Sequence, residues 1–316
     1  MPHFNSAYAE VFKAGELTLG LMTPLGDDKR DLAVMDDQFR LAAMADELGF
    51  GALWVRDVPL MIPQGDDNTA SNLDDPFIWL AGMAGATKRI ALGTAAAVLT
   101  LRHPLHLAKT ALSMDRLSKG RFILGLGSGD RPAEFSAFRQ DPETRAEVYR
   151  ERWALLRSAL NSSPERRAAL RSATGGFDIM GPPAGDIPMV VVGSARQSLQ
   201  WIAGNADAWA TYHREQERQQ GRIGLWRQSL EQKGESLGKP FIQSLQLELK
   251  SDPDAVAEPL ELGLRTGRNG LRSYLASLKS MDVSHAILNL TLGQRHAEDV
   301  IEEIGRYVLP GCSLLE

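Results

Sequence analysis

Short apolar runs alternate with longer amphipathic segments along most of the 316-residue chain. Each run has the length of a buried strand, and the segments between the runs carry apolar residues at helical spacing. Strands that alternate with helices form a parallel sheet, and a sheet of this size closes most simply on itself. The pattern therefore predicts one α/β domain, a (β/α)8 TIM barrel with insertions. The eight strand candidates are residues 17–22, 52–55, 90–98, 122–126, 188–192, 208–211, 243–249 and 286–290.

Three segments do not fit this alternation. Residues 1–16 form an N-terminal extension, and residues 58–75 and 174–187 are long irregular insertions. Loops that follow the strands of a βα barrel lie over its active face, so residues 58–75 are predicted to form a lid. Residues 174–187 precede a strand and are predicted to be structural. The predicted helices span 32–48 and 146–160, and two more begin at Pro76 and Pro104, because proline suits a first helical turn.

Composition and charge narrow the class of protein. A net charge of −5 disfavours a nucleic-acid-binding surface, which normally needs a basic balance. The longest apolar stretch, Ile90–Leu101, is too short to span a bilayer, and the N-terminus lacks a secretory signal, so we expect a cytoplasmic protein without a membrane segment. Cys312 is the single cysteine, and His103 and His106 have no accompanying ligand motif, so no disulfide and no metal site are predicted.

Three motifs in a fixed order carry the functional information. Residues 90–104 read IALGTAAAVLTLRHP, residues 115–132 read DRLSKGRFILGLGSGDRP, and residues 188–203 read PMVVVGSARQSLQWIA. Together they resemble the bacterial-luciferase-like flavin-dependent oxidoreductases, and the resemblance spans roughly residues 17–310. It implies a barrel that binds FMN.

The first two motifs are expected to hold the flavin ring. The small side chains of Thr94, Ala95 and Ala96 permit close approach to a strand end, and the resemblance implies a cis peptide between the two alanines. A close-packed strand is the alternative. The glycines of Gly127-Ser128-Gly129 allow positive φ and close approach to a ligand; a tight turn without a ligand is the alternative there.

The third motif is expected to bind the flavin phosphate. It follows an apolar strand and is predicted to open a helix, whose N–H groups and dipole attract anions. Luciferase itself carries a reactive cysteine and an arginine where this chain has Gly127 and Ser128, so Arg131 or Arg196 would have to supply that charge. Ser194 as a helix N-cap is the alternative. The expected phosphate contacts are Gly193, Ser194, Ala195, Arg196 and Ser198.

Candidate catalytic groups are fewer. Arg56 and Asp57 end the second strand where the luciferases carry a Glu-His pair. Arg56 is a candidate to hold an anionic substrate or the reduced flavin, and Asp57 a candidate acid or base, although a structural Arg–Asp pair fits equally well. His103 is the nearest candidate proton carrier and His213 a second, while His103 also suits a turn-fixing role. The basic loop from Arg265 to Arg268 is a further candidate phosphate clamp, with a solvated loop as the alternative.

The resemblance and the missing dinucleotide fingerprint together favour a two-component monooxygenase. Such an enzyme takes reduced FMN from a separate flavin reductase and uses O2 to oxidise a small organic substrate. The alternatives are hydride transfer with a deazaflavin coenzyme, a catalytically silent flavin-binding subunit, and a sugar-phosphate barrel enzyme without flavin. A homodimer is expected, paired through the small-residue helix that contains Leu80, Met83 and Ala84; packing of that helix within its own chain is the alternative.

Overall fold

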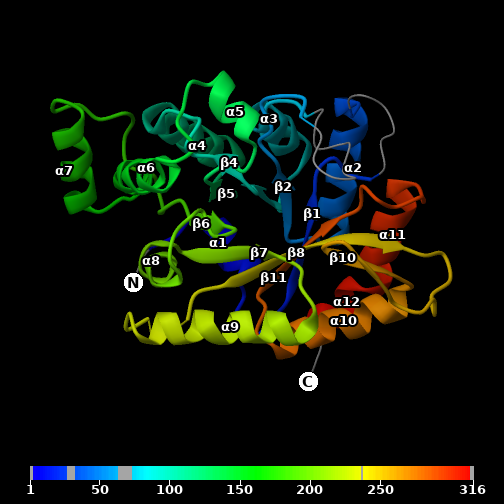
Figure 1. The fold of residues 1–316 in the computed structure, drawn as a ribbon. Coiled ribbons are helices and arrows are strands. Elements are labelled where there is room, and N and C mark those ends of the chain that lie inside the picture. The colour runs from blue at the N-terminus through cyan, green and yellow to red at the C-terminus, as the bar shows by residue number, and fades with distance from the viewer. Residues whose placement is uncertain (1–2, 27–32, 63–72, 236–237, 314–316) are drawn as a thin grey trace.

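Eight parallel strands close into a barrel with helices between them (Figure 1). The computed structural model describes residues 3–26, 33–62, 73–235 and 238–313. Each strand pairs with the next around the ring, and the pairing of β8 with β11 completes the closure. The predicted barrel is confirmed. Its strands are β1 (Thr18–Met22), β2 (Ala52–Val55), β3 (Ala91–Thr94), β5 (Phe122–Gly127), β6 (Met189–Val192), β7 (Ala208–Tyr212), β8 (Phe241–Leu249) and β11 (His285–Asn289).

The helices form the outer layer. The two predicted to begin at proline do so, and the Asp75 side chain caps one of them by accepting from the N–H groups of Phe77 and Ile78. No helix within the described residues is long and apolar enough to cross a membrane. The helices are α1 (Ser6–Val11), α2 (Met35–Leu48), α3 (Pro76–Ala86), α4 (Pro104–Ser118), α5 (Pro132–Ala137), α6 (Arg145–Ala159), α7 (Pro164–Ala173), α8 (Leu199–Asn205), α9 (Gln216–Glu231), α10 (Arg268–Ser280), α11 (Ala297–Tyr307) and α12 (Leu309–Ser313).

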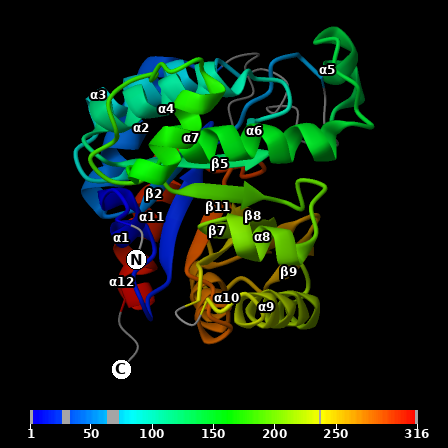
Figure 2. The same ribbon diagram turned by 90° about the vertical axis from the view of Figure 1, so that its left-hand side faces the viewer.

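Three insertions modify the regular barrel. The predicted strand 90–98 is broken after Thr94 and resumes as β4 (Ala97–Val98), which pairs with β5. A hairpin of β9 (Glu258–Leu260) and β10 (Gly263–Thr266) extends β8. Helix α7, which the sequence did not predict, packs on α6 and lies at the outer edge of the molecule (Figure 1); in Figure 2 it faces the viewer. Of the predicted lid, residues 63–72 lie outside the described part of the chain.

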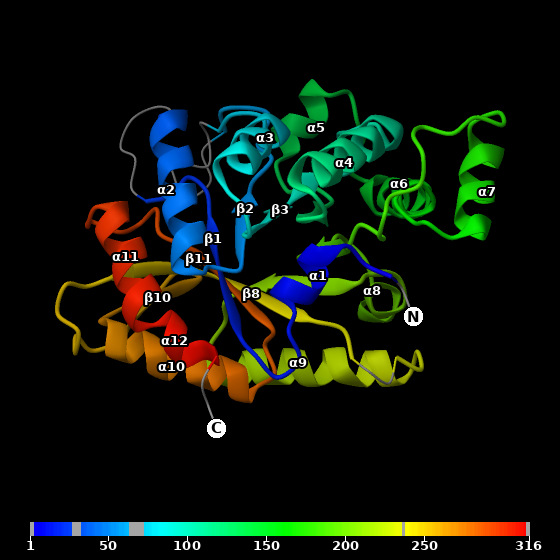
Figure 3. The same cartoon turned by 180° about the vertical axis from the view of Figure 1, so that it is seen from behind.

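The barrel has an inner and an outer apolar layer because side chains alternate across each strand. Leu19, Leu21 and Leu53 point outward to the helices, whereas Trp54 and Ile123 point inward. Helix α1 lies against the barrel (Figure 3), and its Ala7 and Val11 belong to the inner cluster. The predicted N-terminal extension is therefore part of the barrel core.

A buried histidine completes this inner layer. His285 is fully buried, its Nε2 accepts from Trp54 Nε1 at 3.0 Å, and its Nδ1 lies 2.7 Å from Thr18 Oγ1. Burial lowers the pKa of His285 to about 3, so the folded protein keeps the ring neutral. In the unfolded chain the His285 ring has its ordinary pKa of 6.5 and takes up a proton below that pH. His285 therefore lowers the stability of the fold as the pH falls from 6.5 towards 3.

The expected dimer helix packs within its own chain. Leu80 and Met83 of α3 are fully buried and Ala84 nearly so. A Cβ at Gly82 would collide with the ring of Phe39 from α2, so these two helices are in close contact. The apolar face that suggested a homodimer is thus occupied by the chain itself.

Gly20 leaves the space that the buried His285 ring occupies. A Cβ at Gly20 would lie 2.5 Å from His285 Nε2 and 2.9 Å from the Ala52 carbonyl oxygen. We expect Gly20→Ala to lower the free energy of unfolding by about 1–3 kcal/mol, measured by urea denaturation, because overpacking forces the core apart. In the matched control, Gly224→Ala, the new methyl group meets no atom within 4 Å on the surface of α9, and stability should stay equal or rise. Equal effects of the two substitutions would contradict this account of the core.

Candidate active site

A cleft of about 330 Å³ opens at the carboxyl ends of β2, β3, β5, β6 and β7. This is the end at which βα barrels place their active sites. Twelve of the predicted site residues line it, together with Val58, Val98, Asp130, Arg145, Val192 and Tyr212. The predicted residues are Arg56, Asp57, Ala95, Ala96, Gly127, Ser128, Gly129, Arg131, Gly193, Ser194, Ala195 and Arg196.

Small residues form one wall of the cleft. The Ala95–Ala96 peptide is cis, as the family resemblance implied. A Cβ at Gly127 would lie 3.2 Å from the Cβ of Ala96, so a larger residue at Gly127 would crowd this wall. Gly129 has a φ of 77°, a conformation that favours glycine. The wall therefore leaves room for a flat ring to lie against backbone.

Thr94 lies behind this wall and does not line the cleft. It is fully buried, its Oγ1 donates to the Gly125 carbonyl oxygen at 2.7 Å, and it accepts from the Gly125 N–H at 3.0 Å. A Cβ at Gly125 would lie only 1.9 Å from the Thr94 carbonyl oxygen. Thr94 thus ties the end of β3 to β5 and sets the position of the two alanines that follow.

The loop after β6 differs from the prediction. Residues 193–196 form a turn in which Gly193, Ala195 and Arg196 have φ values of 69°, 46° and 58°. Helix α8 begins only at Leu199, and Ser198 is its N-cap, accepting from the Trp201 N–H at 3.2 Å. The expectation that Gly193-Ser194 opens the helix directly is therefore wrong, and so is Ser194 as N-cap. The cleft is lined by the turn itself.

The described cleft residues carry more positive than negative charge. Arg56, Arg131, Arg145 and Arg196 line the cleft against Asp57 and Asp130. Arg145 has a fixed position, because its Nη1 donates to the Gly129 carbonyl oxygen at 3.2 Å and its guanidinium lies 5.9 Å from the Phe135 ring centre. Asp57 is neutralised by Arg102, which does not line the cleft. An anionic ligand therefore fits this wall.

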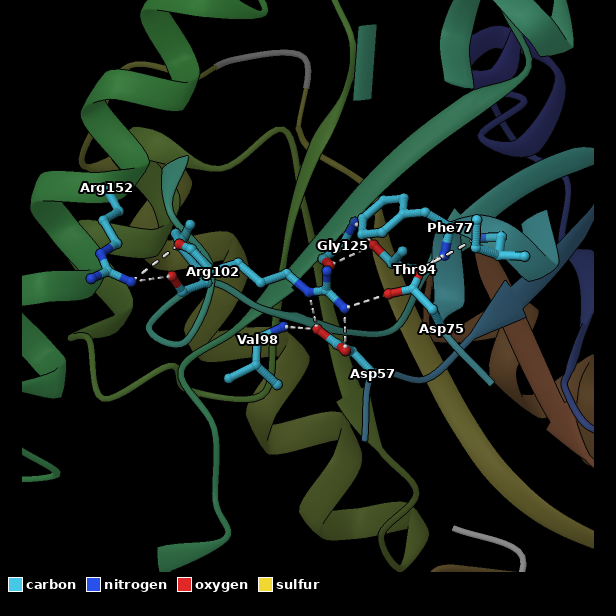
Figure 4. Close-up of polar contacts among 10 residues, drawn as sticks. Asp57, Asp75, Phe77, Thr94, Val98, Arg102, Gly125 and Arg152 are labelled. Carbon is cyan, nitrogen blue, oxygen red and sulfur yellow. Dashed lines mark hydrogen bonds and ion pairs between the residues drawn. The ribbon is translucent and has the colours of Figure 1, made fainter. Parts of the chain in front are cut away.

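The Asp57 carboxylate is held by a bidentate ion pair (Figure 4). Only 4% of Asp57 is exposed, and it accepts from Arg102 Nε at 2.7 Å, Arg102 Nη2 at 2.8 Å and the Val98 N–H at 2.9 Å. Arg102 also reaches Asp75 at 3.1 Å and lies over the Phe77 ring. The sequence left open a structural pair between Asp57 and Arg56. The structure instead pairs Asp57 with Arg102, which lies just before Pro104.

The predicted histidines lie outside the cleft. His103 is exposed and its Nδ1 accepts from the Leu105 N–H at 3.3 Å, so it caps α4, the turn-fixing role left open by the sequence. It lines a neighbouring pocket of about 300 Å³ that shares Asp57 with the cleft. His213 lies 2.7 Å from the Tyr274 hydroxyl, and burial lowers its pKa.

The arginines of the basic segment before α10 form ion pairs within the chain. Arg265 lies on β10 and pairs with Glu248 at 2.7 Å and Glu258 at 3.2 Å. Arg268 is the first residue of α10 and pairs with Glu303 at 3.2 Å. These contacts attach the hairpin and α10 to their neighbours.

Comparison with known proteins defines the class. The family model described as luciferase-like monooxygenase matches residues 17–299. The chain therefore belongs to the luciferase-like monooxygenase family.

Individual relatives differ in their cofactor. The chain is 33% identical over 126 residues to 4-hydroxyprotoasukamycin monooxygenase from Streptomyces nodosus subsp. asukaensis, a match that covers 39% of this chain and about a third (31%) of that relative. An F420-dependent secondary alcohol dehydrogenase superposes with a TM-score of 0.74 at 14% identity, covering 95% of this chain and 100% of that one. The oxygenating constituent of 3,6-diketocamphane monooxygenase from Pseudomonas putida, solved with FMN, superposes with a TM-score of 0.67 at 14% identity and covers the same shares of the two chains.

Removing the Asp57 charge should loosen the edge of the cleft. We expect Asp57→Asn to lower the free energy of unfolding by about 1–3 kcal/mol, because Arg102 loses a buried bidentate partner while the amide oxygen can still accept from Val98. Arg40→Gln is the control, since it breaks the exposed Arg40–Glu298 pair and should cost less than about 1 kcal/mol. Urea denaturation measures both. An Asp57→Asn protein as stable as the wild type would show that the ion pair does not hold the loops.

Proposed function

We propose that this protein is a flavin-dependent monooxygenase that binds reduced FMN in the cleft and oxidises a small organic substrate with O2. A separate flavin reductase would supply the reduced FMN. The observation that carries the proposal is the cleft itself, in which a wall of small residues stands beside a turn and side chains that suit an anion. Membership of the family supports the same reaction class.

The spacing of the strands assigns the two ends of the bound FMN. Arg131 follows β5 and Arg196 follows β6, and these strands are neighbours, so both guanidinium groups can approach one phosphate. Arg56 follows β2, three strand positions from β6, which is roughly 14 Å at about 4.8 Å per strand. We therefore assign the phosphate to the 193–196 turn with Arg131 and Arg196, and the ring to Ala95, Ala96 and Gly127.

Each group around the bound ring would have a distinct role. Reduced FMN, when bound, supplies the electrons for oxygen activation. Arg56 would contact the substrate or the ring edge as a fixed positive charge. Asp57 would hold the loops after β2 and β4 in place through Arg102, and its three hydrogen bonds make it a positioning group in this scheme. His103 would supply protons from the neighbouring pocket, which shares Asp57 with the cleft.

A deazaflavin-dependent hydride transfer is the second candidate. The specific observation in its favour is that Arg56, Arg131 and Arg145 line the cleft in addition to Arg196. A long acidic coenzyme tail would require more positive charge than the 193–196 turn alone offers. The same barrel occurs in an F420-dependent secondary alcohol dehydrogenase.

Anaerobic titration with reduced FMN and reduced riboflavin separates the two ends of the site. Arg196→Gln should weaken FMN binding about tenfold, the equivalent of one charged contact, and leave riboflavin, which lacks the phosphate, unchanged. Gly127→Val should weaken both flavins because its side chain would enter the ring wall. Arg218→Gln, on the exposed surface of α9, is the control and should change neither.

The outcomes also separate the rival functions. Binding of coenzyme F420 without binding of either flavin would replace the proposal by the deazaflavin candidate. Flavin binding that leads only to peroxide release with every substrate tested would favour a silent flavin-binding subunit. Equal loss of FMN and riboflavin binding in Arg196→Gln would show that the phosphate lies elsewhere.

A further inference from the structure

A buried carboxyl group without a partner lies directly behind the cleft. Glu134 on α5 is fully buried, and neither Oε1 nor Oε2 has a hydrogen-bond partner. The neighbouring Phe135 packs close to Gly129, which lines the cleft: a Cβ at Gly129 would lie 3.0 Å from the Phe135 ring. In Figure 2, α5 lies at the upper right of the molecule. A buried unpaired carboxylate is costly, so the site favours a neutral carboxylic acid.

Charged groups of both signs act on Glu134. Among the described residues, Arg131 and Asp130 act on it from the segment that leads into α5, and Asp57 acts on it from the loop after β2. Burial raises the pKa of Glu134, Arg131 lowers it, and Asp57 and Asp130 raise it further. The nearby Leu60 N–H also lowers this pKa, without completing a hydrogen bond to either oxygen. Arg131 is thus the one cation among the groups that act on this carboxyl.

Arg131 connects this carboxyl to the ligand site. It is the N-cap residue of α5, and its carbonyl oxygen accepts from the Glu134 N–H at 3.1 Å. Its side chain is 11% exposed and lines the cleft beside the 193–196 turn. Its Nη1 lies 3.7 Å from Asp130 Oδ1, so an ionised Glu134 would compete with Asp130 for this guanidinium.

We propose that Glu134 is a titratable positioning residue that controls whether Arg131 serves the anion site of the cleft. Neutral Glu134 leaves the guanidinium on the cleft wall. Ionised Glu134 needs a counter-charge within its buried surroundings, and Asp57 and Asp130 have the wrong sign, so it draws Arg131 towards α5. Anion affinity therefore falls as Glu134 loses its proton. The proposal rests on the proposed function only for the identity of the anion, the phosphate of FMN.

A double-mutant cycle tests the link without any flavin. Melting temperatures are compared for the wild type, Glu134→Gln, Arg131→Gln and the double variant along a pH series, from an acidic end at about pH 5 to an alkaline end at about pH 9. At the acidic pH, Arg131→Gln should change the melting temperature by the same amount in the wild type as in the Glu134→Gln background. At the alkaline pH it should lower the melting temperature by about 2 °C more in the wild type, because only the ionised carboxyl pairs with Arg131. Glu134→Met, neutral and of similar length, repeats the cycle should Glu134→Gln fail to fold.

The functional readout is the FMN dissociation constant of the wild type divided by that of Glu134→Gln. The phosphate itself gains negative charge between the two pH values, and the ratio removes this shared effect. The ratio should rise about five- to tenfold from the acidic to the alkaline pH, as expected for loss of one charged contact. Riboflavin, without the phosphate, should show a constant ratio.

The proposal would be overturned if the two substitutions had additive effects on the melting temperature at the alkaline pH, or if their coupling were equal at both pH values. It would also be overturned if the ratio of the two FMN dissociation constants did not change with pH. If the cycle behaves as expected but the wild type binds no flavin at either pH, the proposed function fails while the control of Arg131 by Glu134 stands.

Discussion

The bidentate ion pair between Asp57 and Arg102 is the contact on which the cleft depends. Its two residues lie 45 positions apart, one after β2 and the other in the turn that follows β4. Asp57 also accepts from the Val98 N–H, Arg102 reaches the N-cap residue of α3, and Arg152 of α6 donates to the carbonyl oxygens of Thr100 and Arg102 (Figure 4). One buried carboxylate thus fixes the loops after two strands and the starts of two helices.

The end of the barrel at which the strands begin is filled by side chains, and the cleft lies at the opposite end. Trp54, His285 and the residues of α1 fill the interior from the end at which the strands begin. Large side chains such as Trp54 fill that end, whereas one wall of the cleft at the other end is formed by small residues, among them Ala95, Ala96, Gly127 and Gly193. Because the barrel interior is filled at the end where the strands begin, the interior opens to a ligand at the carboxyl ends of the strands, where the cleft lies.

Local pattern was sufficient for the fold, while the site depended on long-range contacts. All eight strands follow from short apolar runs because each is buried on both faces. The cis peptide at Ala95–Ala96 came from the family resemblance and has no signal in hydrophobic spacing. Arg102 as partner of Asp57 was missed because the two are brought together only by barrel closure. The short α8 was placed too early because Ser194 and Ser198 both suit an N-cap, and only the structure shows that Ser198 fills that role.

A crystal structure of the protein soaked with FMN would test the central claim most directly. The account predicts the ring against Ala95, Ala96 and Gly127, and the phosphate at the 193–196 turn within reach of Arg131 and Arg196. FMN in the pocket beside His103 and His106, or with its phosphate next to Arg56, would contradict the assignment of the cleft.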